Sequence, residues 1–249
     1  MELGVTRLGE GPPVVFVHGS VVGADLTFRK QHELADRWTL IFPDRPGFGE
    51  SPPLERGDFE AEAPLFAQLL GDGAHLVGHS YGGVIAMLAA AQRPDAVRSL
   101  TLSEPGLLRF CADRPEVAEM IANGERLYAD PESIPNELFL RLFRTGAGSA
   151  YETPDELPDY LARGAEMVKR ERPPWEAEIP LDELAGAGFP VLILSGGHSR
   201  AFDLVCDALA ERLGAERAVI TGRGHTIPGT GAPYNERLAG FLSSAERGG

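Results

Sequence analysis

The sequence predicts an α/β fold: a mostly parallel, doubly wound sheet with helices on both faces and a helical insertion. Short apolar runs bounded by Gly, Pro or Asp recur along the 249 residues, and stretches with helical spacing separate them. This alternation stops over one long segment in the middle of the chain. Strands buried on both faces of a parallel sheet have continuous apolar sequences, and their alternation with helices favours such a sheet.

Six apolar runs are the candidate strands, and five stretches between or after them have the apolar spacing of helices. The candidate strands are Val14–Val17, Leu40–Phe42, His75–Val77, Leu100–Leu102, Val191–Leu194 and Ala218–Ile220. The candidate helices are Phe28–Asp36, Ala63–Leu70, Tyr81–Gln92, Phe202–Leu213 and Tyr234–Leu242.

The regular alternation fails between Leu107 and Pro180, where the composition shifts to Pro, Glu, Arg and scattered aromatics. The interval to the next apolar run is several times the usual connection between elements. Three stretches opened by prolines and acids predict helices within it. They are Pro115–Tyr128, Pro135–Phe143 and Leu157–Val168. We therefore expect residues 1–106 and 181–249 to form the core domain and residues 107–180 to form a helical cap.

Charge and composition exclude several classes of function. The chain has 37 acidic and 23 basic residues, and its formal charge of −14 repels nucleic acid and anionic membrane surfaces. Cys111 and Cys206 stand far apart and form no metal-binding or disulfide pattern, and no apolar run reaches the length of a membrane span. We expect a cytoplasmic protein with a small-molecule substrate, no nucleic-acid or membrane partner, no metal and no cofactor. The sequence leaves monomer and homodimer open.

The segment from Gly78 to Gly83, GHSYGG, holds a G-x-S-x-G pattern between a candidate strand and a candidate helix. A chain that turns from strand to helix within a few residues forces Ser80 into a strained turn and lifts its hydroxyl above the sheet. Glycine at positions 78 and 82 removes β-carbons that would collide there. The pattern in this position indicates a nucleophilic serine; the plainer alternative is a glycine-rich turn with an incidental serine.

Four motifs in this order resemble those of the α/β-hydrolase family, over nearly the whole chain outside the insertion. Besides the serine turn, Phe16–Ser20 ends an early strand as the family's oxyanion turn does. Asp44–Ser51 looks like the loop after the next strand, in which Asp44 and Arg45 are expected to form a local ion pair. Gly222–His225 matches the catalytic-histidine loop after the last strand.

The resemblance implies roles for several residues. Ser80 would be the nucleophile and His225 the base that takes its proton, because a serine hydroxyl is a weak nucleophile without one. The backbone N–H groups of Ser20 and Tyr81 would form the oxyanion hole. Phe48 is a candidate substrate-binding residue because its loop lies near that hole. Of the other histidines, His18 and His75 are expected in the scaffold, His79 in the scaffold or against the substrate, and His32 and His198 as bystanders.

The acid of the triad is the point at which the sequence departs from the commonest family pattern. Many members carry an aspartate where this chain has Ser199, and a neutral serine cannot stabilise the imidazolium of His225. A buried strand earlier in the chain runs directly into Glu104, at the carboxyl edge of the sheet where ligands bind in open α/β folds. Some family members take their acid from this strand, so we expect Glu104 to be the acid. The alternatives are Asp203, an unidentified acid or none, and Glu104 could instead cap a helix of the insertion.

These residues predict a cofactor-free serine hydrolase with a Ser-His-Glu triad. A cap over the serine suits a small or medium, mainly apolar ester better than a polymer. The segment 107–180 has 9 basic and 15 acidic residues, which disfavours highly anionic acyl carriers. A carbon–carbon bond hydrolase, lactonase, thioesterase or perhydrolase on the same triad are alternatives. A non-catalytic ligand-binding protein is the alternative of another class. A haloalkane dehalogenase is disfavoured, because it needs a carboxylate where Ser80 stands.

Overall fold

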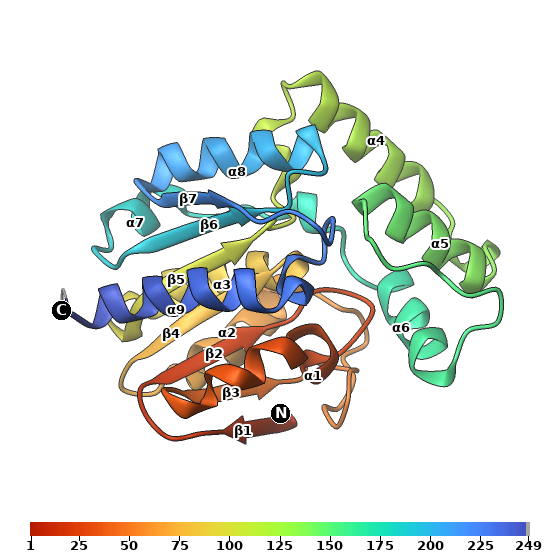
Figure 1. Ribbon diagram of the computed structural model, residues 1–249. Helices are drawn as coiled ribbons and strands as arrows, with labels where there is room; N and C mark the ends of the chain where they lie inside the picture. The colour runs from red at the N-terminus through yellow and green to blue at the C-terminus, as the bar shows by residue number, and fades with distance from the viewer. Residues whose placement is uncertain (248–249) are drawn as a thin grey trace.

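The computed structural model describes residues 1–247 and confirms the predicted α/β class. Seven strands form one sheet in the order β1-β3-β2-β4-β5-β6-β7 (Figure 1). All neighbouring pairs are parallel except β1 with β3. The strands are β1 (Val5–Leu8), β2 (Pro13–Val17), β3 (Thr39–Pro43), β4 (Ala74–His79), β5 (Val97–Ser103), β6 (Val191–Ser195) and β7 (Glu216–Val219).

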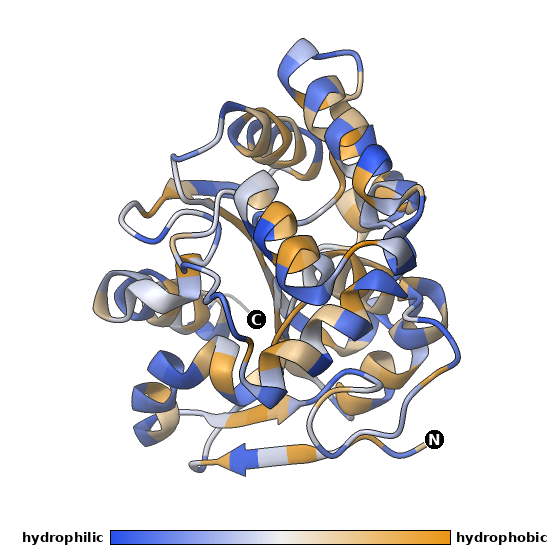
Figure 2. Ribbon diagram, turned by 90° about the vertical axis from the view of Figure 1, so that its right-hand side faces the viewer, coloured by the Kyte–Doolittle hydropathy of each residue, from blue (hydrophilic) through white to orange (hydrophobic). Residues whose placement is uncertain are grey.

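The two edge strands are the ones that the sequence pattern describes least well. β1 has no counterpart among the expected strands, because it is mostly exposed and has no continuous apolar run. Figure 2 shows its mixed hydropathy beside the N-terminus. β7 begins two residues before the expected strand Ala218–Ile220, and it too is only partly buried. A strand with a single neighbour and an open face does not need the apolar run on which the expectation depends.

Helices cover both faces of the sheet, and successive strand residues point to opposite sides. Val15 and Val17 belong to the apolar cluster under α2, α3 and α8, whereas Val14 and Phe16 belong to the cluster under α1 and α9. The helices of the two layers are α1 (Ala24–Phe28), α2 (Phe59–Leu69), α3 (Tyr81–Gln92), α7 (Leu181–Gly186), α8 (Arg200–Leu213) and α9 (Ala232–Arg247).

The expected helix Phe28–Asp36 is instead a 3₁₀ helix over Arg29–Asp36 that follows the short α1. Its buried residues are Gln31 and Leu34. Side chains three residues apart align in a 3₁₀ helix, so this spacing places both on the inner side. The sequence pattern is correct about helical character and wrong about the type of helix.

Three helices of the segment 107–180 lie beyond the carboxyl ends of the strands: α4 (Pro115–Tyr128), α5 (Asn136–Ala147) and α6 (Asp159–Lys169) (Figure 1). They have a small apolar cluster of their own, to which Phe139 and Val168 contribute. Val21, from the loop after β2, belongs to the same cluster, so the helices are packed against the edge of the sheet. Within residues 1–247, none of the helices combines the length and hydropathy that a bilayer span requires.

Candidate active site

Ser80 lies at the sharp turn between β4 and α3. Its φ of 55° and ψ of −121° place its backbone in a conformation that residues other than glycine rarely adopt. The turn leaves no room for side chains beside it: a β-carbon on Gly82 would lie 2.2 Å from the carbonyl oxygen of Val17, and one on Gly78 would lie 2.7 Å from that of Gly82. The glycines on either side of the serine are therefore sterically required.

The three residues expected to form the triad, Ser80, His225 and Glu104, form one chain of hydrogen bonds. The Ser80 Oγ lies 2.8 Å from the Nε2 of His225, and the Nδ1 of His225 lies 2.7 Å from the Oε2 of Glu104. His225 lies in the loop after β7, and its ring stacks on Phe202 at a centroid distance of 4.5 Å. The stacking and the two hydrogen bonds leave the imidazole little freedom to rotate.

Glu104 is fully buried directly after β5, which lies between the strand of the serine and β6. Its Oε1 accepts a hydrogen bond of 2.6 Å from the backbone N–H of Gly196. Burial opposes its ionisation, but the interactions with the rings of His198 and His225 and with the Gly196 N–H outweigh this effect and lower its pKa to about 2. Asp203, the alternative acid, instead accepts a hydrogen bond from the hydroxyl of Ser195, and its Oδ1 lies 3.5 Å from the Nη2 of Arg217.

Backbone strain is concentrated at this site. Three residues other than glycine have positive φ among those that the structure describes, namely Val21 at 80°, Ser80 at 55° and Glu104 at 42°. Each such residue costs on the order of 1–3 kcal/mol, and this strain persists only where the surrounding structure enforces it. Helix α6 packs directly on Val21, since a β-carbon on Gly164 would lie 2.0 Å from the Val21 carbonyl oxygen. The segment 107–180 thus helps to hold the loop after β2.

The loop after β2 also brings Ser20 near the nucleophile, which Tyr81 follows directly in the chain. Gly19 is packed against Ser80, so that a β-carbon there would lie 3.1 Å from the Ser80 β-carbon. Within residues 1–247, neither the Ser20 N–H nor the Tyr81 N–H, at the first position of α3, donates to another protein group. Both amides are therefore available to a ligand. The Ser20 hydroxyl is engaged elsewhere, because it donates a 2.5 Å hydrogen bond to the Oε2 of Glu171.

A buried ionic cluster lies behind this loop. Arg45 binds Glu62 through two hydrogen bonds of 2.8 and 3.0 Å, and its Nη1 lies 2.8 Å from the Oε1 of Glu171. The expected ion pair with Asp44 is wrong: Asp44 accepts from the Ala24 N–H at the start of α1 instead. Burial raises the pKa of Glu171, and the charge of the Glu62 carboxylate, which shares the same guanidinium, acts in the same direction.

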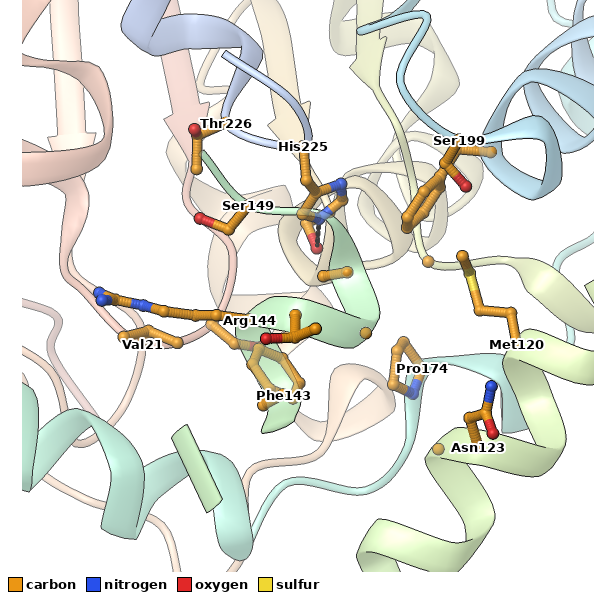
Figure 3. A pocket seen from close by; sticks show the side chains of 18 of the residues that line it. Val21, Met120, Asn123, Phe143, Arg144, Ser149, Pro174, Ser199, His225 and Thr226 are labelled. Carbon is orange, nitrogen blue, oxygen red and sulfur yellow. Dashed lines mark hydrogen bonds between the residues drawn. The ribbon is translucent and has the colours of Figure 1, made fainter. Parts of the chain in front are cut away.

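A cavity of about 770 Å³ opens above Ser80 and His225, between the sheet edge and the cap helices. Figure 3 shows Val21 and Phe143 on one side of it and Met120 and Ser199 on the other, with His225 towards the top of the view. Most of the lining surface is apolar, with Leu108, Leu127, Trp175 and Phe202 among its residues, and charged side chains line it as well, namely Glu116, Glu119, Arg126, Arg144 and Arg200. The serine hydroxyl is therefore directed into an apolar space.

The two expected substrate-binding residues lie in different surroundings. His79 is among the residues that line the cavity; its Nε2 is 2.8 Å from the carbonyl oxygen of His225, and burial lowers its pKa to about 4. Phe48 is not among them. It is buried under its loop, edge-on against the ring of His18 at 4.9 Å, because an apolar loop residue packs where a neighbouring ring offers contact.

His198, which the sequence suggested was a bystander, lies against Glu104 instead. Its Nδ1 is 3.4 Å from the Oε1 of Glu104. Together with His225 these residues offer three potential metal-ligand atoms within 4.8 Å of one another, but the His225 and Glu104 atoms are already hydrogen-bonded to each other. The sequence feature that could have indicated this contact is the position of His198 in the turn after β6, where many family members carry their acid.

A sheet of this topology with a serine at a strand-to-helix turn is the arrangement of α/β hydrolases. The chain belongs to the alpha/beta hydrolase family, whose model matches residues 14–242. It is similar to the pimeloyl-[acyl-carrier protein] methyl ester esterase of Chromobacterium violaceum, with 43% identity over 102 residues that cover 41% of this chain and 40% of that protein. The match to the esterase of the same name from Aeromonas salmonicida, 29% identical, covers 65% of each chain. The chain thus spans less than two thirds of either relative.

Two further comparisons cover most of the chain. Lipase LipV of Mycobacterium tuberculosis is 29% identical over 253 residues, with 92% of both chains covered. A thermophilic esterase from Thermogutta terrifontis has a similar structure, with a TM-score of 0.72, 24% identity, and coverage of 98% of this chain and 93% of that one. At this identity the structural likeness concerns the fold alone.

Proposed function

We propose that the protein is a cofactor-free serine hydrolase that cleaves esters of small or medium, mainly apolar acids through an acyl-enzyme. The observation that carries the proposal is the continuous hydrogen-bond chain from Ser80 through His225 to Glu104, which ends at an apolar cavity. The similarity to proteins named as esterases and a lipase supports the same class of reaction.

In the first half of the reaction, the Ser80 Oγ attacks the ester carbonyl carbon and its proton passes to the Nε2 of His225. Glu104, held ionised by its hydrogen bonds, stabilises the imidazolium that forms. The ester C–O bond then breaks, and the alcohol leaves with the proton from His225. The acyl group stays on Ser80.

Water completes the cycle as the second nucleophile, and Ser80 is now the leaving group. It gives a proton to His225 and attacks the acyl carbon, the acyl–Oγ bond breaks, and Ser80 regains its proton as the free acid forms. In both halves the negative oxygen of the tetrahedral intermediate would accept from the free N–H groups of Ser20 and Tyr81. One lost donor of this kind costs about 10²- to 10³-fold in turnover in related chemistry.

The substrate class follows from the cavity and its charge. Apolar side chains from both the core and the segment 107–180 line it, which suits a medium acyl chain. We infer that this segment acts as a lid domain over the serine. The cavity lining from this segment includes both acidic and basic side chains, namely Glu116, Glu119, Arg126 and Arg144, so the lining itself does not select by charge. The segment as a whole has 15 acidic and 9 basic residues, and this net charge disfavours highly anionic acyl carriers. We therefore propose a free ester, in contrast to the carrier-bound ester in the names of two relatives.

Two experiments test the proposal. A fluorophosphonate probe with peptide mapping should label Ser80 and nothing else, and Ser80→Ala should abolish the label. A panel of p-nitrophenyl esters of graded chain length, beside a lactone and a diketone, should show turnover with an optimum at short to medium acyl chains. An unlabelled Ser80 in folded protein would contradict the hydrolase assignment. Turnover of the lactone or diketone alone would contradict the ester assignment.

A further inference from the structure

His198 contacts both the triad carboxylate and the end of a cap helix. Its Nδ1 lies 3.4 Å from the Oε1 of Glu104, and its Nε2 lies 3.1 Å from the carbonyl oxygen of Ala147, the last residue of α5. The ring is not among the residues that line the cavity, so it does not act on the substrate directly. Its position is that of a link between the cap and the triad.

Both ring nitrogens of His198 face acceptors. A carbonyl oxygen can only accept, so Nε2 must carry a hydrogen. In the neutral ring the lone pair of Nδ1 would then point at the Glu104 carboxylate, which is repulsive. Only the imidazolium donates on both sides.

The charged groups around His198 favour this form. Glu104 faces it from the end of β5, Asp203 from α8, and the carbonyl end of α5 from the cap; the ring of His225, 6.3 Å away between centroids, is the opposing titratable group. Burial alone lowers the pKa of His198, but the attraction of the Glu104 carboxylate 3.4 Å away and the hydrogen bond to the Ala147 carbonyl outweigh it, and the pKa is raised above its usual value. A cation is also favoured at a helix C-terminus.

The backbone leaves room for the ring at this place. A β-carbon on Gly148, whose φ is 69°, would lie 2.4 Å from the Cδ2 of His198, and one on Gly196 would lie 2.9 Å from its Nδ1. The Gly148 carbonyl accepts a 3.0 Å hydrogen bond from the backbone N–H of His225. The end of α5 is therefore bonded to both histidines.

We propose that His198 is a positioning residue for ester hydrolysis: as an imidazolium it holds the Oε1 of Glu104, leaves Oε2 for His225, and fastens the end of the α5 cap helix to the triad. This proposal rests on the proposed function, because it takes Glu104 as the triad acid. The positive charge of His198 also opposes protonation of His225. Loss of the charge therefore moves the acid limb of the kcat/KM profile to higher pH.

Two neutral variants separate the two contacts. His198→Gln places a donor near the Ala147 carbonyl and loses the donor to Glu104, whereas His198→Asn keeps a donor near Glu104 and does not reach Ala147. Removal of a unit charge about 6 Å from the catalytic imidazole shifts the acid limb up by about 0.5 to 2 units in both variants, for an effective dielectric constant between about 80 and about 20. In addition, His198→Gln loses the donor to Glu104, and its kcat falls about fivefold, the equivalent of one ordinary hydrogen bond. His198→Asn loses the contact with the cap helix at Ala147, and its main change is a higher KM.

The matched control is His32→Gln, because His32 lies 3.5 Å from Asp25 and away from the triad. This variant should leave the pH profile of kcat/KM unchanged. An unmoved acid limb in both His198 variants, with folding confirmed by thermal melts, would overturn the proposal, because a merely structural role changes stability but not the pH position.

Long-range ¹H–¹⁵N spectra of the wild-type histidine rings supply a readout that needs neither activity nor a folded variant at position 198. Because the pKa of His198 is raised above 6.5, the proposal expects a ring assigned to His198 that is mainly doubly protonated at pH 6.5. In Glu104→Gln, this ring should lose its second proton at a lower pH than it does in the wild type. A neutral His198 ring at pH 6.5 refutes it. Doubly protonated His198 in a protein that turns over no ester would refute the proposed function and leave the link between His198 and Glu104 standing.

Discussion

Replacement of Glu104 by Gln is the perturbation that most directly tests the candidate triad. The Oε2 of Glu104 lies 2.7 Å from the Nδ1 of His225 in a fully buried site. Opposite unit charges about 4 Å apart attract by about 4 kcal/mol at an effective dielectric constant of about 20, which corresponds to about three orders of magnitude in rate.

The hydrogen bond from Gly196 adds a second effect. Its N–H requires an acceptor at the position of Oε1, so the amide nitrogen that Glu104→Gln introduces would face His225. The Nδ1 of His225 would then have to accept, and its Nε2 would carry the hydrogen and be unable to take the proton of Ser80. Glu104→Gln is therefore expected to lower kcat with a p-nitrophenyl ester by about two to four orders of magnitude, with little loss of structure.

The control is Asp203→Asn, because Asp203 contacts Ser195 and Arg217 and has no contact with the imidazole. It should be nearly silent in the same assay, and circular dichroism should show both variants folded. Near-normal turnover in Glu104→Gln together with a crippled Asp203→Asn would refute the assignment. Ser199→Asp in the Glu104→Gln background is expected to restore part of the activity if the turn after β6 still points at His225.

Three further predictions concern the nucleophile, the cap and the pH dependence of stability. Ser80→Ala should lower turnover by at least about three orders of magnitude without changing the melting temperature much, because the triad acts as a unit; retained turnover in a clean preparation would contradict it. Amide hydrogens of residues 107–180 should exchange faster than those of the central strands and become protected after phosphonate labelling, whereas equal protection before and after labelling would indicate a rigid domain. Because folding lowers the pKa of Glu104 from 4.5 to about 2, its contribution to the free energy of unfolding is fully present above pH 4.5 and is lost as the pH falls towards 2. The measurement is the free energy of unfolding of the wild type and of Glu104→Gln as a function of pH, and a constant difference between the two curves over this range would contradict the prediction.

Some features could be predicted from the sequence because the signal is local. Central strands are buried on both faces, so their sequences are continuously apolar, and the glycines at 78 and 82 mark a turn with no space for β-carbons. The order of the motifs along the chain was sufficient to propose Ser80 and His225 as a pair, and Glu104 was proposed because it directly follows an apolar strand while Ser199 occupies the usual position of the acid. Edge strands and the 3₁₀ helix lack such a signal, since partial exposure removes the apolar run and 3₁₀ and α spacing are alike over one or two turns.

Other features depend on segments that are distant in sequence. Glu171 comes from the cap and reaches Arg45 and Ser20 behind the loop after β2, and no spacing in the chain announces that contact. His198 contacts Glu104 only because β6 lies beside β5 in the sheet, although 92 residues separate Glu104 from Gly196 at the start of the same turn.

The sequence by itself determined the α/β class and predicted Ser80 and His225, with Glu104 as the preferred acid among alternatives, because a strand-to-helix turn and the ends of apolar strands are local patterns. The tertiary structure alone decided that Glu104 and not Asp203 contacts His225, that Phe48 packs away from the cavity, and that His198 shares the carboxylate. The physical reason is that strand order and cap packing set which side chains meet, and both arise from burial summed over the whole chain.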